Sequence, residues 1–179
     1  MTQKKLTSDN FLVPDRANPL QMGLDRSGHE SQLSAAEWAR QILEVELGPE
    51  VPKQVAALFE GAHGLLLYGF FWCPLYAHGV AESFQAADSA VAVKCEIEGA
   101  PARAVPTFQT RIAWLFERGV LNEADVTEWE SLRHLRNEFA QRSERTLFPA
   151  LWTLDLLERV ARGVNRLYRG STANPKASP

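Results

Sequence analysis

Three polar side chains of the segment Ser131–Gln141 have the types and spacing that could handle a phosphate. Arg136 lies at the edge of an apolar helical stripe, since at about 100° per residue it projects between Trp129 and Leu132. A guanidinium in that position offers a bidentate fork for a phosphate or for a phosphorane-like transition state. The amide of Asn137 can orient a ligand or the arginine. These residue types indicate recognition of an anion.

Gln141 ends the same segment, and its side chain limits the chemistry available there. A histidine accepts and returns a proton near neutral pH, whereas a glutamine amide can hydrogen-bond but cannot serve as a general base. His134 lies about 200° around the helix from Arg136, so it is a poor substitute and we expect it to be exposed. Neither Gln141 nor His134 therefore offers proton transfer beside Arg136.

Arg136 also has a purely structural interpretation. It would then pair with a carboxylate of the long helix predicted to begin at Pro74, with Glu82 and Asp88 as candidates, or set the geometry of a dimer. The ligand-binding interpretation uses Arg133, Arg136 and Glu82. The wider basic cluster consists of Arg133, Arg136, Arg142 and Arg145. Neighbouring glutamates lower the positive electrostatic potential of this cluster. Arginines late in a helix are also favoured by the helix dipole.

Composition narrows the class of protein. A chain of 179 residues that is 45% hydrophobic can bury one sizeable core, and its net charge of −3 gives no bulk attraction to nucleic acid. Only two cysteines occur and no secretory leader is recognisable, which favours a reduced, cytoplasmic context. The most apolar stretch, 65–76, is interrupted by Gly69 and Pro74 and is shorter than the roughly 20 residues of a membrane span, so we expect core packing and no membrane.

Helix signals follow one another along most of the chain. Ser34, Thr107 and Asn122 are cap residues, and Pro52, Pro74 and Pro149 are favourable first-turn residues. The predicted helices run over 34–48, from 52 to 61 or 68, and over 74–98, 107–119, 122–143 and 149–170. This pattern predicts an all-α protein, an antiparallel bundle of five or six helices in a single domain over 34–170.

The two ends of the chain lack a sustained helical or strand period. We expect residues 1–33 to be extended or disordered and residues 171–179 to be a disordered tail. Phe11, Leu12 and Val13 form an apolar tag that could dock on the body or on a second copy. No metal-ligand spacing, glycine-rich phosphate loop, HExxH motif or nucleophile elbow occurs, so we expect no metal and no cofactor.

The segment Leu132-Arg136-Asn137-Glu138-Phe139-Ala140 resembles the signature of the HEPN superfamily, and the likeness extends over about 74–168. The resemblance implies a helical fold, a dimer with the arginine and a histidine at its cleft, and metal-independent RNA cleavage in catalytic members. Family members without the histidine act as binding or partner modules in toxin–antitoxin, phage-defence or stress systems. Arg136 and Asn137 match the signature, whereas Gln141 stands in place of the histidine.

Three functional hypotheses follow. The first is a non-catalytic HEPN-like homodimer that binds a nucleic acid, a nucleotide or a protein partner in a bacterial stress or defence context. The second is a metal-independent endoribonuclease that tolerates Gln141 and takes a histidine from elsewhere in the dimer. The third is a structural helical protein in which Arg136 forms an ion pair. We favour the first, because Gln141 cannot transfer a proton.

Overall fold

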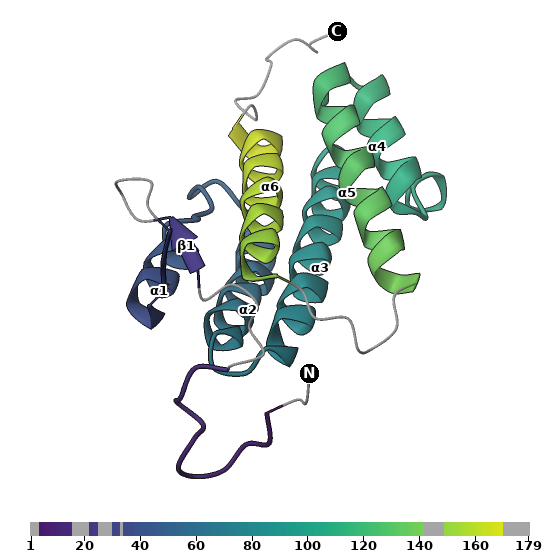
Figure 1. Ribbon diagram of the computed structural model, residues 1–179. Helices are drawn as coiled ribbons and strands as arrows, with labels where there is room; N and C mark the ends of the chain where they lie inside the picture. The colour runs from purple at the N-terminus through teal and green to yellow at the C-terminus, as the bar shows by residue number, and fades with distance from the viewer. Residues whose placement is uncertain (1–3, 16–21, 25–29, 33, 142–148, 170–179) are drawn as a thin grey trace, which may run out of the picture.

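Six α-helices form an antiparallel bundle in the computed structural model of the described residues, which are 4–15, 22–24, 30–32, 34–141 and 149–169 (Figure 1). The helices are α1 (Ala35–Leu43), α2 (Lys53–Gly69), α3 (Pro74–Ile97), α4 (Phe108–Glu117), α5 (Glu123–Gln141) and α6 (Ala150–Arg169). A 3-10 turn, η1 (Ala102–Ala104), precedes α4. The all-α class and the number of helices confirm the sequence prediction.

The predicted cap residues begin three of these helices. The Ser34 hydroxyl accepts a hydrogen bond from the Glu37 backbone N–H at 3.1 Å. Thr107 and Thr110 exchange backbone-to-side-chain hydrogen bonds in a capping box at the start of α4. The Asn122 side chain accepts from the Asp125 N–H at 3.0 Å before α5. Each cap satisfies backbone donors that a helix leaves without partners in its first turn.

One helix end differs from the prediction, and for a second helix the structure selects the longer of the two predicted ends. Helix α1 ends at Leu43 and not near Gly48, because the following connection is held against α6 by one amide side chain. Asn165 accepts from the Gly48 N–H at 2.7 Å and donates to the Glu46 carbonyl at 2.9 Å. Helix α2 runs on to Gly69, past Gly61 and Gly64, because packing against α3 outweighs the low helix propensity of glycine.

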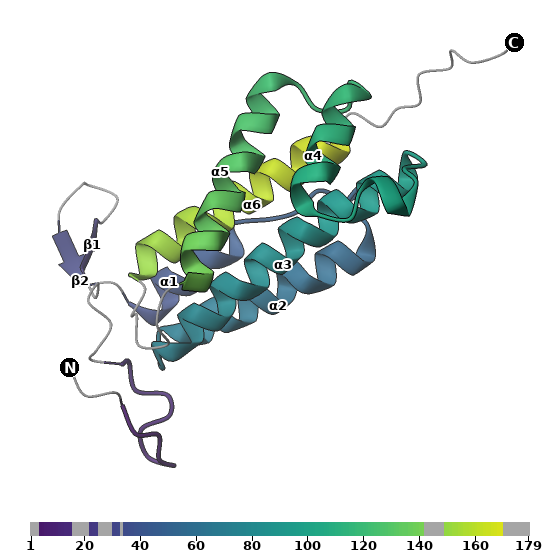
Figure 2. The ribbon, with the colours of Figure 1, turned by 90° about the vertical axis from the view of Figure 1, so that its right-hand side faces the viewer.

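The core lies between α2, α3 and α6, with α1 covering one side and α4 and α5 lying along α3 (Figure 2). Trp38 of α1 is fully buried, and its indole N–H donates to the Leu66 carbonyl at 3.0 Å. The Trp38 and Tyr76 rings meet edge to face at 5.8 Å between centroids. Three large apolar side chains of the helices are exposed by 42–53%, namely Leu43, Phe116 and Leu151. They lie at the margins of their helices' packed faces.

The apolar stretch 65–76 forms the end of α2, a short connection and the start of α3. Phe70 and Tyr76 are almost fully buried, which confirms core packing for these residues, whereas Tyr68 of the same stretch is 55% exposed. No helix in the described part of the chain is both long enough and apolar enough to cross a bilayer. Close approach of α2 and α3 requires glycine at position 79, since a Cβ there would lie 2.6 Å from the Leu66 side chain.

The N-terminal part contains structure that the sequence did not predict. Two three-residue strands, β1 (Met22–Leu24) and β2 (Glu30–Gln32), pair antiparallel with Met22 opposite Gln32. Residues 4–15 form a loop whose ends contact the α2–α3 connection (Figure 1, purple). The other residues of the predicted N-terminal tail, and the predicted tail over 171–179, lie outside the described residues.

Candidate functional site

Three helices bring charged side chains together around Asp88 of α3. Arg111 of α4 approaches the Asp88 carboxylate through Nη1, 3.3 Å from Oδ2 and 3.4 Å from Oδ1. Arg136 of α5 reaches the same carboxylate with Nη1, 3.5 Å from Oδ1. We call Asp88, Arg111 and Arg136 the Asp88 cluster. It holds two guanidinium charges against one carboxylate, so it carries a net positive charge.

The two arginines of the Asp88 cluster are held differently. Arg111 is 22% exposed and also donates from Nε to the Val105 carbonyl at 3.2 Å, so its side chain is fixed at two points. Arg136 is 49% exposed, and its only ion pair among the described residues is the one to Asp88. A half-exposed pair at this distance is weak, on the order of 0–1 kcal/mol. Arg136 can therefore turn from Asp88 to an external anion at small cost.

The surface beside Arg136 is apolar and contains only a very small recess. A recess of about 10 Å³ is lined by Phe84, Ala87, Phe108, Leu132, Arg133 and Arg136. That volume is at the lower limit for one water molecule. A ligand of Arg136 would therefore bind on the surface of α3, α4 and α5 rather than inside a pocket.

The other predicted site residues of α5 are Arg133, Asn137 and Gln141, and they differ from Arg136 in their contacts. Arg133 donates from Nε to Glu130 at 2.6 Å, so a neighbouring carboxylate balances its charge. The side chains of Asn137 and Gln141 are exposed and form no hydrogen bonds with the described residues. Gln141 lies about 140° around α5 from Arg136 and about 7.5 Å further along its axis. The helix does not place the two side chains on one face.

Glu82 is not brought to Arg136. It lies on α3 facing α2, where its Oε1 is 3.3 Å from the position that a Cβ on Gly61 would take. Asp88, the other carboxylate considered as a partner, occupies the place beside Arg136. Two further residues of the predicted basic cluster, Arg142 and Arg145, lie outside the described residues.

None of the described histidines makes a hydrogen bond to Arg136, Asn137 or Gln141. His134 is exposed, as predicted, and its Nε2 lies 3.4 Å from Nη2 of Arg133. His63 is buried in α2 against the Phe59 ring, and its Nε2 has no hydrogen-bond partner among the described residues. His78 is exposed on α3.

The cysteines are not placed to act as nucleophiles. Burial, and then the nearby carboxylate of Asp15, raise the pKa of the Cys73 thiol to about 12. Burial likewise raises the pKa of the Cys95 thiol. In the part of the chain that the structure describes, no group of three or more His, Cys, Asp or Glu side chains could hold a metal ion.

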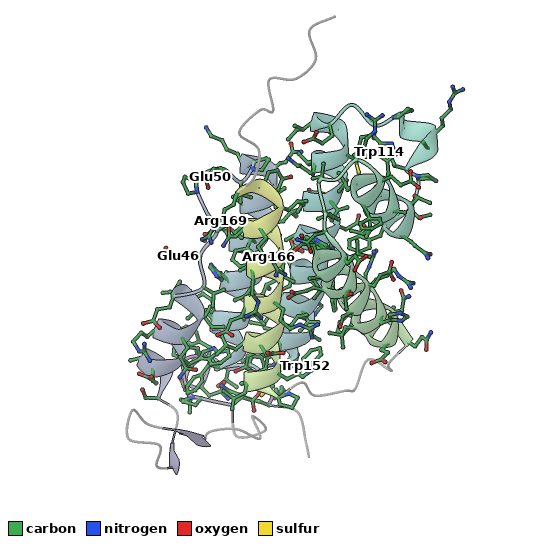
Figure 3. All side chains as sticks on the ribbon, turned by 90° about the horizontal axis from the view of Figure 1, so that it is seen from above. Glu46, Glu50, Trp114, Trp152, Arg166 and Arg169 are labelled. Atoms are coloured by element: carbon green, nitrogen blue, oxygen red, sulfur yellow. The ribbon has the colours of Figure 1, made fainter. Side chains whose placement is uncertain are left out.

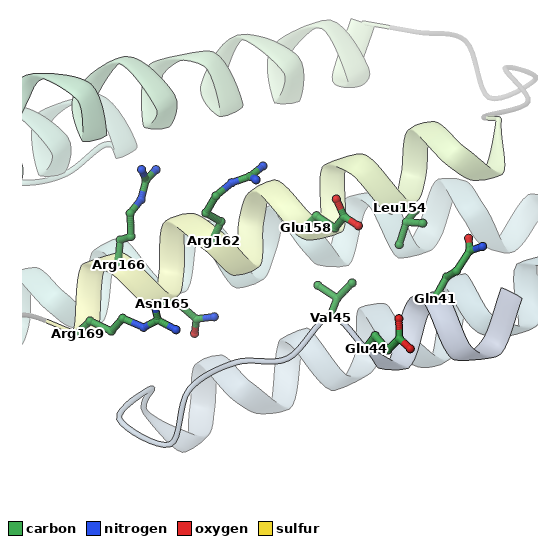
Figure 4. A pocket seen from close by; sticks show the side chains of 9 residues that line it. All are labelled: Gln41, Glu44, Val45, Leu154, Glu158, Arg162, Asn165, Arg166 and Arg169. Atoms are coloured by element: carbon green, nitrogen blue, oxygen red, sulfur yellow. The ribbon is translucent and has the colours of Figure 1, made fainter. Parts of the chain in front are cut away.

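A larger recess, of about 760 Å³, lies between α1 and α6 (Figure 4). Its lining is mixed in charge and consists of Gln41, Glu44, Val45, Leu154, Glu158, Arg162, Asn165, Arg166 and Arg169. Arg162 and Arg166 point toward α5, where Arg162 pairs with Glu128 and Arg166 pairs with both Glu128 and Asp125. Arg169 projects from α6 near the connection that carries Glu46 and Glu50 (Figure 3). Most of the basic charge in this recess is thus neutralised within the bundle.

Comparison with protein-family models, with curated proteins and with solved structures found no match for this chain. The assignment of a site therefore depends on the geometry described above.

Sequence reasoning missed Arg111 as a member of the site. Its one signal is its place next to Ile112, a fully buried residue of α4, which puts a charged side chain at the edge of a packed face. The pattern within one helix cannot show that α4 and α5 present their arginines to the same carboxylate. The recess between α1 and α6 left no comparable signal, because its lining combines residues that are distant in the sequence.

Proposed function

We propose that this chain is a non-catalytic HEPN-like helical module that binds a phosphate group of a nucleic acid or nucleotide at the Asp88 cluster. The observation that supports it is the single carboxylate of Asp88 shared by two guanidinium groups, of which Arg136 is half exposed. A phosphate at Arg136 would balance the excess charge and receive two parallel hydrogen bonds from the guanidinium. The module acts as a homodimer in the cytoplasm, in a bacterial stress or defence system, as its resemblance implies.

Lack of catalysis is part of the proposal. Proton transfer from a ribose 2′-hydroxyl needs a base within hydrogen-bond reach, and the glutamine amide at position 141 cannot accept that proton. None of the described histidines bonds to Arg136. Arg136 can stabilise negative charge, but none of the described histidines lies beside it to remove the proton.

Binding of a fluorescent single-stranded RNA and of ATP tests the proposal directly. We expect Arg136→Ala to weaken binding about tenfold, and Asp88→Asn to strengthen it because the competing carboxylate charge is gone. In a plot of the logarithm of the binding constant against the logarithm of the salt concentration, the slope should become less steep by about one for Arg136→Ala. Arg103→Ala is the matched control, since Arg103 is an exposed arginine on η1 with no ion pair among the described residues.

The outcomes of this experiment separate the proposal from its alternatives. Equal affinity of wild type, Arg136→Ala and Arg103→Ala would overturn the assignment of the site. Failure of both RNA and ATP to bind would overturn the proposal of a phosphate ligand. Intact RNA after incubation with wild type, together with cleavage by Gln141→His, would show a HEPN site that lacks only its base. Cleavage by wild type that Arg136→Ala abolishes would instead establish the endoribonuclease.

The structural alternative is favoured by the ion pair between Arg136 and Asp88. In that alternative the pair serves only to join α5 to α3. Arg136→Ala would then lower the melting temperature and leave phosphate binding absent in every variant. A melting temperature close to that of wild type, combined with lost RNA binding, assigns the arginine to the ligand.

A further inference from the structure

Exposed apolar side chains gather at one end of the molecule. Nine large hydrophobic residues of the described chain are substantially exposed, and five of them are Leu6, Phe11, Leu12, Val13 and Tyr68, at 45–57% exposure. The remaining four lie singly on α1, α3, α4 and α6. Scattered apolar residues are normal on a protein surface, whereas a cluster is typical of an interaction site.

These side chains form one surface, which we call the apolar loop face. The Lys4 ammonium donates to the Val13 carbonyl at 2.5 Å and to the Phe71 carbonyl at 3.0 Å, which places Val13 next to the α2–α3 connection. The Phe71 ring lies 6.5 Å from the ring of Tyr68, centroid to centroid. The loop 4–15 projects beyond the ends of α2 and α3 in two perpendicular views (Figures 1 and 2).

Hydrogen bonds fix the loop 4–15 so that its apolar tip stays exposed. Asp15 is 2% exposed, donates its backbone N–H to the Phe70 carbonyl and accepts from the Cys73 N–H at 3.1 Å. Within the loop, the Asn10 side chain accepts from the Thr7 N–H at 2.9 Å and donates to the Lys5 carbonyl at 3.0 Å. An apolar tip that is held in place by such bonds loses little conformational entropy when a partner covers it.

We propose that the apolar loop face is a self-association surface that packs against the same face of a second copy around a two-fold axis. Such an interface must be complementary to itself. Beside the apolar tip the loop carries one exposed cation, Lys5, and one exposed anion, Asp9. Neither forms an ion pair with the described residues, so across a two-fold axis Lys5 of each copy can meet Asp9 of the other.

The size of the face sets the strength of the contact. Large side chains of about 150–250 Å² that are half exposed leave on the order of 400 Å² of apolar surface here. A stable interface buries about 800 Å² on each partner, so the loop supplies the apolar centre and the neighbouring connection supplies the rim. We therefore expect a dimer that dissociates upon dilution. The inference shares only the dimeric state with the proposed function, because it uses no residue of the Asp88 cluster.

Sedimentation equilibrium of the full chain, from micromolar to millimolar concentration, tests this surface. The double variant Phe11→Ser and Leu12→Ser should raise the dimer dissociation constant at least about tenfold, because each change occurs twice in the interface. Phe116→Ser is the matched control, since Phe116 is 44% exposed on α4 and should leave association unchanged. Circular dichroism should show native helix content in every variant.

Charge reversal makes the test specific for a two-fold contact. Lys5→Asp and Asp9→Lys should each weaken association, and the double variant should restore it because both new pairs are again opposite in sign. A wild type that stays monomeric at millimolar concentration would overturn the proposal. Equal association of the wild type and the Phe11→Ser and Leu12→Ser variant would also overturn it.

Two further measurements distinguish other occupants and the separate proposal of a ligand. Co-sedimentation of a monomeric wild type with phosphatidylcholine vesicles, lost in the Phe11→Ser and Leu12→Ser variant, would replace the second copy with a lipid surface. RNA and ATP binding by the same variant should equal that of wild type. A chain that dimerises through the loop but binds no phosphate contradicts only the proposed phosphate site. A monomer that binds phosphate contradicts this inference and the dimeric state, and leaves the proposed phosphate site intact.

Discussion

Helices α5 and α6 are nearly equal in length, at 19 and 20 residues, yet they bury very different surfaces. Ten residues of α6 are buried, compared with only Trp129 and Leu132 of α5. Both carry an apolar stripe in the sequence, but α6 packs extensively against α3 while α5 lies mainly against α4. The bundle thus consists of a densely packed body of α1, α2, α3 and α6 and an edge of α4 and α5. The body supplies stability, and the edge presents its polar side chains.

The largest expected difference between body and edge comes from removing a core leucine. Leu157→Ala in α6 should lower the free energy of unfolding by about 2–5 kcal/mol, because Leu157 is fully buried and its loss leaves a cavity. Leu135→Ala in α5 should cost less, roughly 1 kcal/mol, since Leu135 is only partly buried. Urea unfolding measures both values. Equal losses would contradict the distinction between body and edge.

A glycine pair tests the packing within the body. Gly79→Ala should lower the free energy of unfolding by about 1–3 kcal/mol, because the new Cβ would lie 2.6 Å from the Leu66 side chain and force α2 and α3 apart. Gly64→Ala is the control, since a Cβ there meets nothing within 4 Å and should stabilise α2 by about 0.5–1 kcal/mol. Thermal melts of the two variants should shift in opposite directions. Shifts of the same sign would show that α2 and α3 can separate freely.

Alkaline pH should weaken the body, because its buried acids keep their protons in the folded chain. The pKa of the Cys73 thiol is raised from 9.0 to about 12, and burial also raises the pKa of Cys95 and Tyr168. The unfolded chain loses these protons first, so stability is complete below pH 9 and declines as pH rises toward 12. For Cys73 the slope should be at most about 1.4 kcal/mol per pH unit.

Urea unfolding at several pH values between about 8 and 11 measures this decline. Cys73→Ala should flatten the curve, and native thiols should react slowly with a disulfide reagent at neutral pH. Rapid labelling of a native cysteine would contradict the burial of both thiols.

The smallest expected effect on stability is at the edge. Arg136→Ala should change the free energy of unfolding by only about 0–1 kcal/mol, because its pair with Asp88 is half exposed. Urea unfolding of this variant beside Arg103→Ala measures the difference. A loss as large as that of Leu157→Ala would show that the ion pair is structural.

Local rules predicted the beginnings of all six described helices, whereas the end of α1 differs from the prediction by several residues. Ser34, Thr107 and Asn122 act within their own first turn, so the sequence nearby contains the whole cause of each cap. The end of α1 depends on Asn165, more than a hundred residues away, and no local pattern contains that contact. Glycines that weaken an isolated helix were tolerated in α2 because its packing against α3 compensates.

In the candidate site, too, some features follow from the nearby sequence and others depend on distant contacts. The edge position of Arg136 followed from helical periodicity, and Asp88 was one of two carboxylates considered as its partner. Choosing between Asp88 and Glu82 required the rotation of α3 relative to α5, which depends on packing among several helices. The second arginine, Arg111, enters the site only because α4 and α5 both lie along α3.

The sparse burial of α5 also affects how often this helix opens. With two buried side chains, this helix can separate from α3 while the body stays folded, so its amide hydrogens should exchange with solvent sooner than those of α6. Such an opening would carry Arg136 away from Asp88 and return it on closure. The charge offered to a ligand would then vary with the fraction of molecules in which α5 is docked.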